Sequence, residues 1–155
     1  MGLDASNTFW PITPIWIARF VFSAVFLLNI QCAIQFIVTP ELYLTAYELY
    51  GQAGKVALQG LGVAFLMWNA TYPFFIYKPE KYHIIGIVIL AQQAIGLVGE
   101  TTILLSLQSD HEMLYASILR FIAFDGIGLL LMIISFVILL VTLKSMPTKS
   151  IETKN

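Results

Sequence analysis

Residues 114–143, LYASILRFIAFDGIGLLLMIISFVILLVTL, form the longest apolar run of this chain. Arg120 and Asp125 are its only residues that are charged at neutral pH. A helix needs about 20 mainly apolar residues to cross the hydrocarbon core of a bilayer. The run is therefore predicted to be a membrane-spanning helix with two charged groups inside it.

The composition of the whole chain agrees with this prediction. Of its 155 residues, 59% are hydrophobic and only 11% are charged, whereas soluble domains carry about 25% charged residues. The mean hydropathy is +0.84. These values predict an integral protein of the lipid bilayer. They argue against a nucleic-acid partner, which is recognised by clustered Lys and Arg residues.

Four apolar segments predict an all-α fold, namely a membrane-spanning four-helix bundle. The four predicted helices cover residues 14–38, 56–77, 82–107 and 114–143. This transmembrane domain, residues 14–143, is flanked by an N-terminal segment, residues 1–13, and a tail, residues 144–155. The tail is rich in Lys, Ser and Thr and is expected to be flexible.

The connection between the first two predicted helices, TPELYLTAYELYG, spans residues 39–51. Pro40 is expected to end the first helix, and Gly51 suits a helix C-cap. The leucines and tyrosines predict a short helix in the membrane interface, since tyrosine combines an apolar ring with a hydroxyl that favours water. An ordered loop is the alternative.

The lysines predict the orientation of the chain. They gather on the side that holds both termini and the second connection: Lys78, Lys81, Lys144, Lys149 and Lys154. On the other side, Lys55 is the only lysine. Because cytoplasmic loops carry an excess of Lys and Arg, both termini, with the terminal segments, are expected in the cytoplasm.

Polar side chains follow single faces of the predicted helices. Gln93 and Glu100 share a face of the third helix with Gly96, and Gln59 and Asn69 share a face of the second. Amide side chains hydrogen-bond between helices, and glycine lets two helices approach closely. These faces are therefore expected inside the bundle. In the first helix, Gln31 and Gln35 share a face, with Asn29 off it.

Three ionisable residues, Glu100, Arg120 and Asp125, are the strongest site candidates. If the third and fourth helices form a hairpin, Glu100 and Arg120 lie about 10 Å and about 9 Å from its tip, so they can pair. Asp125 lies deeper, at about 16 Å, and is expected to have a different main partner. Each such group costs roughly 2.5–3.5 kcal/mol at mid-membrane. The cluster either fixes helix register or contacts a ligand, proton or substrate.

Other chemistry has little support in the sequence. Cys32 is the single cysteine, so the chain has no internal disulfide or Cys-x-x-Cys redox pair. Residues 110–112, Asp-His-Glu, cannot all face one ion from a regular element, so a solvated turn and no metal site are predicted. No complete catalytic set is present, and whether the protein is an enzyme stays open.

The chain resembles the DoxX-like membrane proteins, a group of small four-helix bacterial and archaeal proteins. The resemblance spans residues 17–140 and rests on the size, the cytoplasmic termini, the TPELY…AYELYG segment, and the Arg120 and Asp125 pair. It implies a prokaryotic plasma membrane. Some DoxX-like proteins are linked to quinone-coupled sulfur oxidation or stress responses, and many have no known activity.

Three functions are compatible with these patterns. The first is a non-enzymatic membrane protein whose polar core fixes helix packing and which serves as a subunit of a membrane complex or a homo-oligomer. In the second, a quinone-like lipophile is bound between helices by Gln93, Glu100, Arg120 and Asp125. The third is a small proton-coupled transporter with Glu100 or Asp125 as the proton carrier. Such a transporter would act as a dimer. The sequence does not specify the oligomeric state, the partner subunits or the substrate.

Overall fold

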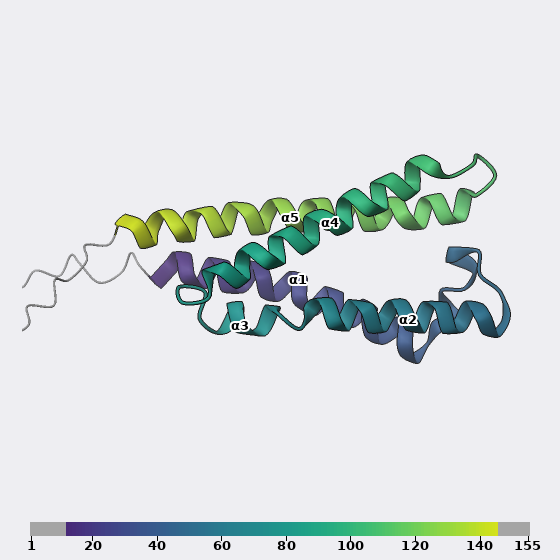
Figure 1. The fold of residues 1–155 in the computed structure, drawn as a ribbon, viewed down its shortest axis with the longest axis horizontal. Coiled ribbons are helices and arrows are strands. Elements are labelled where there is room, and N and C mark those ends of the chain that lie inside the picture. The colour runs from purple at the N-terminus through teal and green to yellow at the C-terminus, as the bar shows by residue number, and fades with distance from the viewer. Residues whose placement is uncertain (1–11, 146–155) are drawn as a thin grey trace, which may run out of the picture.

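A computed structural model describes residues 12–145, and every regular element in this range is a helix (Figure 1). The elements are α1 (Ile12–Val38), the 3₁₀-helices η1 (Pro40–Leu42) and η2 (Thr45–Tyr47), α2 (Gly51–Asn69), α3 (Tyr72–Tyr77), α4 (His83–Ser106) and α5 (Glu112–Ser145). The all-α prediction is confirmed. Most of the predicted terminal segments, residues 1–13 and 144–155, lie outside the described residues.

The longer helices run roughly along one axis (Figure 1). One end of the molecule holds η1, η2 and the α4–α5 turn, and is called the loop end here. The opposite end holds the start of α1 and the end of α5, and is called the terminal end. The most extensive contacts join α1 to α2, α4 to α5, and α1 to α5. Because α1 contacts both α2 and α5, it links the two halves of the chain.

Among residues 12–145, three helices, α1, α4 and α5, are long and apolar enough to cross a membrane. These helices begin and end within two residues of the predicted positions. The less apolar α2 carries Gln52, Lys55 and Gln59. The membrane-spanning four-helix bundle therefore stays a prediction, while three long apolar helices are observed.

The second predicted helix, residues 56–77, is not continuous. It is divided into α2 and α3 by a turn at Ala70 and Thr71. Pro73 lies in the first turn of α3 and has no N–H to donate to the carbonyl one turn earlier, so it interrupts the ladder of helix hydrogen bonds. The prediction of one helix over residues 56–77 is therefore wrong.

The connection after α1 forms two short 3₁₀-helices instead of one interfacial helix. Thr39 and Pro40 follow α1, as predicted for a helix that ends before proline. The left-handed C-cap of η2 is Glu48, with φ of 53°. Gly51, with φ of +62°, is the first residue of α2, so its predicted role as a C-cap is wrong.

The apolar core lies in the half of the molecule toward the terminal end. Its largest buried side chains come from four helices: Phe22, Tyr72, Phe75, Ile89, Met132, Phe136 and Leu139. A Cβ atom on Gly86 of α4 would lie 2.6 Å from the Phe136 ring and 2.7 Å from the Phe75 ring, so only glycine fits there. This packing holds α3, α4 and α5 together and leaves the polar side chains nearer the loop end.

Candidate functional site

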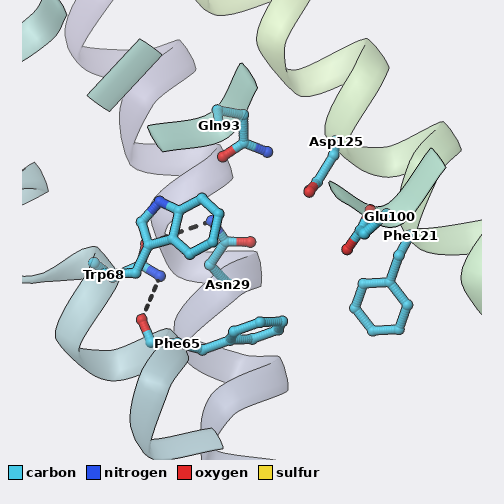
Figure 2. Close-up of a pocket in the computed structure, with 8 residues that line it drawn as sticks. Asn29, Phe65, Trp68, Gln93, Glu100, Phe121 and Asp125 are labelled. Atoms are coloured by element: carbon cyan, nitrogen blue, oxygen red, sulfur yellow. Dashed lines mark hydrogen bonds between the residues drawn. The ribbon is translucent and has the colours of Figure 1, made fainter. Parts of the chain in front are cut away.

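A small cavity lies where α1, α2, α4 and α5 meet, and Figure 2 shows its lining. Its volume is about 30 Å³. The lining residues, which define the polar cavity, are Asn29, Phe65, Trp68, Asn69, Gln93, Glu100, Phe121 and Asp125. Four of the six predicted site residues, Asn69, Gln93, Glu100 and Asp125, therefore come together. A cavity of this size admits one or two water-sized groups and is too small for a quinone ring.

The amides of this cavity connect helices. Asn29 Nδ2 on α1 donates to Asn69 Oδ1 on α2 across 3.4 Å. Asn69 Nδ2 donates to the Phe65 carbonyl one turn earlier, at 2.8 Å. The Tyr72 hydroxyl donates to Gln93 Oε1 at 3.4 Å, which joins α3 to α4. These contacts agree with a role of the amides in helix packing.

The two carboxyl groups have no comparable partners. Among residues 12–145, no Lys, Arg or His nitrogen lies within 4.0 Å of Glu100 or Asp125. Asp125 is only 9% exposed. Glu100 Oε2 and Gln93 Nε2 are buried and have no hydrogen-bond partner in the described part of the chain. A buried polar atom without a hydrogen-bond partner lowers the stability of the fold. These groups therefore indicate a binding site for a small polar ligand or an ion.

The predicted contact between Glu100 and Arg120 is not formed. Arg120 is exposed and lies at a different hollow, while Glu100 faces the polar cavity (Figure 2). The helix rise predicts equal depth for the two residues. Depth does not fix the rotation of each helix about its axis, and that rotation directs the two side chains to different hollows.

Arg120 is held by neutral groups near the loop end. Its Nε donates to the Ala116 carbonyl at 3.2 Å, and its Nη2 donates to Ser117 Oγ at 3.4 Å. Ser117 in turn donates to the Ala46 carbonyl in η2, at 2.8 Å. No carboxylate within residues 12–145 neutralises the guanidinium. Arg120 is thus a positioned cation that has no ion-pair partner in the described part of the chain.

Three hollows follow one another along α5, and together they are called the α1–α5 seam. The first lies between α5 and the connection that contains η1 and η2, and the other two lie between α1 and α5. The first, about 330 Å³, includes Tyr43, Ser117 and Arg120 near the loop end. The second, about 270 Å³, shares Arg120 and Phe121 with the first. The third, about 300 Å³, is apolar and shares Leu28 and Phe124 with the second. The seam therefore changes from cationic to apolar along its length.

Gln59, the sixth predicted site residue, lies outside both features. Its Nε2 donates to the Ile37 carbonyl of α1 at 3.1 Å, so it joins α2 to α1. Conversely, the sequence patterns did not select Asn29 or Trp68 for the site. Asn29 lies off the Gln31 and Gln35 face, and an indole in an apolar helix has no distinguishing period. Their only signal was a polar atom inside an apolar segment.

These features define a helical protein with three candidate membrane spans, an acidic polar cavity and a lateral seam whose arginine forms no ion pair with the described residues. Within residues 12–145, no three His, Cys, Asp or Glu side chains cluster as for a metal ion. No family model, curated protein or solved structure matches the chain. Kinship with the DoxX-like group therefore stays a prediction.

Proposed function

We propose that this protein is a multi-pass membrane protein that binds an amphiphile with an anionic head group in the α1–α5 seam. Membrane insertion is supported by large apolar side chains that α1, α4 and α5 expose, including Phe20 at 76% and Leu105 at 82%. In water so many exposed apolar groups would promote aggregation, whereas lipid chains cover them. The lysine distribution supports cytoplasmic termini.

The observation that carries the binding proposal is Arg120 at the polar end of the seam. A guanidinium binds phosphate or carboxylate through two parallel N–H donors, and such charge-assisted bonds are stronger than neutral ones. Ser117 and Tyr43 add hydroxyl groups beside it. The Tyr43 hydroxyl donates to Gln35 Oε1 at 2.7 Å, which holds the phenol in place.

The apolar end of the seam suits the chain of the same molecule. Its lining contains no charged residue and includes Phe20, Ala24, Leu28, Phe124 and Leu131. Each hollow has a volume near the lower limit for ligand pockets, about 300 Å³, and adjoining hollows share residues. A ligand with a compact anionic head and a long acyl chain matches this order of surfaces.

Two alternatives from the sequence, a packing role for the polar residues and a quinone ligand, are compared with this proposal. The amides Gln59 and Asn69 serve helix packing, and that role is compatible with ligand binding in the seam. A quinone is the main competing ligand, because the DoxX-like resemblance points to quinone chemistry. Its carbonyl oxygen is neutral and leaves the charge of Arg120 uncompensated, so an anionic head is favoured.

Native mass spectrometry of the full chain in neutral detergent tests the proposal. Phosphatidylglycerol, phosphatidylcholine and a menaquinone are added in turn, and the bound fraction is measured. We expect phosphatidylglycerol to bind preferentially. Arg120→Gln is expected to weaken this binding roughly tenfold or more, because a charge-assisted hydrogen bond contributes about 1.5–3 kcal/mol.

Two further variants make the result specific. Lys55→Gln removes the same charge from α2, where Lys55 pairs with Glu41 at 2.7 Å, and is expected to leave the lipid preference unchanged. Ala24→Phe fills the apolar hollow and is expected to weaken binding of a long-chain lipid more than that of a short-chain analogue. Equal binding of the two phospholipids, or preferential binding of the menaquinone, would contradict an anionic head group.

A further inference from the structure

The polar cavity adjoins the α1–α5 seam, with which it shares Asn29 and Phe121, and it holds two carboxyl groups that the amphiphile does not use. In Figure 2, oxygen atoms of Asn29, Glu100 and Asp125 face a common space. These residues come from α1, α4 and α5, so three separate helices bring oxygen ligands together. The proposed lipid ligand lies along the outside of α1 and α5 and has no role for the two carboxyl groups.

Burial makes this arrangement costly unless something is bound. Asp125 is 9% exposed and Gln93 is 2% exposed, and the Gln93 Nε2 atom, without a partner in the described chain, points toward Asp125 (Figure 2). Glu100 Oε2 is also buried and unpartnered. The buried Asp125 and the partly buried Glu100 repel one another when both are ionised, and no side-chain cation within residues 12–145 offsets them. A bound cation would remove this penalty.

We infer that the polar cavity binds one sodium ion, with the Asn29 amide oxygen and the Glu100 and Asp125 carboxylates as ligands. Carboxylate and amide oxygens are the ligands that hard cations prefer. The Gln93 amide then serves as a hydrogen-bond donor beside Asp125 and offsets the remaining negative charge. Trp68 lines the same cavity, and its ring packs against Gly96, where a Cβ would come within 2.6 Å of it.

Cavity size and ligand number select sodium over the common divalent ions. Mg²⁺ usually keeps several of its water ligands, and a volume of about 30 Å³ leaves no room for them. Ca²⁺ takes 6–8 oxygen ligands, whereas two carboxylates and one amide provide at most five oxygens. Transition metals favour sites with His or Cys, and neither residue lines this cavity.

Thermal unfolding of the full chain in neutral detergent tests the inference. NaCl is titrated against choline chloride at constant ionic strength, with KCl, MgCl₂ and CaCl₂ as further series. A ligand that binds only the folded state raises the melting temperature, and we expect Na⁺ to raise it by about 3 °C or more. Asp125→Asn and Glu100→Gln should lose this shift, while Asp110→Asn, in the exposed α4–α5 turn, should keep it.

A second measurement detects binding in the folded protein and does not rely on thermal unfolding. The fluorescence of wild-type protein is followed during the same titrations, with Trp68→Phe as the reference that lacks the cavity indole. We expect a saturable change with Na⁺ that Trp68→Phe loses. Equal responses to Na⁺ and choline, a response to a divalent ion alone, or stabilisation by acid without any Na⁺ response would overturn the inference.

The sodium site and the lipid site can fail separately. Arg120→Gln removes the cation of the seam but leaves the lining of the polar cavity unchanged. We therefore expect Arg120→Gln to retain the Na⁺-dependent shift in melting temperature. If this variant loses both lipid binding and the Na⁺ response, the two sites are not independent and the assignment of sodium to the polar cavity alone is wrong.

Discussion

Asn69 and Asp125 are both buried polar residues in apolar helices, yet their chemistry differs. Asn69 is 3% exposed and has donors and acceptors, so it can bond to its own helix and to Asn29 at the same time. An ionised Asp125 can only accept, and it needs a donor or a cation from elsewhere. Buried Asn69 therefore forms a packing contact between helices, whereas buried Asp125 is a candidate binding group.

Glycine positions show how strongly a single residue can control helix spacing. A Cβ atom on Gly62 would lie 2.7 Å from the Ala33 carbonyl oxygen and 2.8 Å from Ile37 Cγ1, so α1 and α2 pack closely there. We expect Gly62→Ala to force the helices apart and lower the free energy of unfolding by roughly 1–3 kcal/mol. Reversible unfolding in mixed detergent micelles measures the change.

Gly60, on the same helix, is the matched control. No atom of residues 12–145 lies within 4 Å of a Cβ at this position, so Gly60→Ala meets no steric barrier there. Alanine favours a helix over glycine by roughly 0.5–1 kcal/mol, and the variant should be neutral or more stable. Equal destabilisation by the two substitutions would show that close α1–α2 packing is not the cause.

At the scale of the elements, a distant side chain caps the longest helix. Glu48, at the end of η2, accepts the Leu114 N–H in the first turn of α5 at 3.3 Å and also bonds to His111. The first N–H groups of a helix lack partners within it, and a carboxylate there also favours the helix dipole. Contact with Glu48 raises the pKa of His111, and contact with His111 lowers the pKa of Glu48.

These shifts predict a pH dependence of stability. Because the pKa of His111 is raised in the folded protein, its contact with Glu48 contributes fully to the free energy of unfolding below about pH 6.5. This contribution is lost as the pH rises through the raised pKa. Because the pKa of Glu48 is lowered in the folded protein, its carboxylate contributes to the free energy of unfolding above about pH 4.3. This contribution is lost as the pH falls through the lowered pKa. Glu48→Gln should therefore lower the melting temperature most between about pH 4.3 and 6.5.

Thermal unfolding across a pH series, with Glu80→Gln as the control, measures this effect. Glu80 is exposed in the turn before α4 and forms no ion pair among the described residues, so its substitution should have little effect at any pH. The capping account is wrong if Glu48→Gln destabilises the protein equally at pH 5.5 and at pH 9.

At the scale of the whole molecule, α1 joins an apolar core to a polar cavity. Phe22 packs near the terminal end, and Asn29 lines the cavity about two turns further along the same helix. Rigid apolar packing at one end positions the helices that converge on the polar groups. This division explains how a chain with few polar residues can hold two carboxyl groups close together.

The proposed orientation of this molecule in a membrane leads to a labelling prediction. The 24 residues of α4 extend about 36 Å, which exceeds the roughly 30 Å hydrocarbon core. In a Cys32→Ser background, Glu80→Cys and Ser109→Cys are therefore expected to react with an impermeant maleimide from opposite sides. Right-side-out and inside-out membrane vesicles distinguish the two sides, and Glu80→Cys should react from the cytoplasmic side.

Ile95→Cys is the control for this experiment. Its side chain is 71% exposed in the middle of α4, where lipid is expected to cover it. It should therefore remain unlabelled in membranes and react after solubilisation and unfolding. Labelling of Glu80→Cys and Ser109→Cys from one side would contradict a spanning α4.

The sequence by itself determined the helical class, the ends of α1, α4 and α5 to within two residues, and the polar character of the interior. These properties depend on local features, namely the length of apolar runs and the residues that stop helices. Only the tertiary structure decided which polar groups meet. Close packing at Gly62 and of Trp68 against Gly96 sets the rotation and tilt of the helices. That rotation brings Glu100 to Asp125 and Asn29 and leaves Arg120 on the seam, because side chains at equal depth can point in different directions.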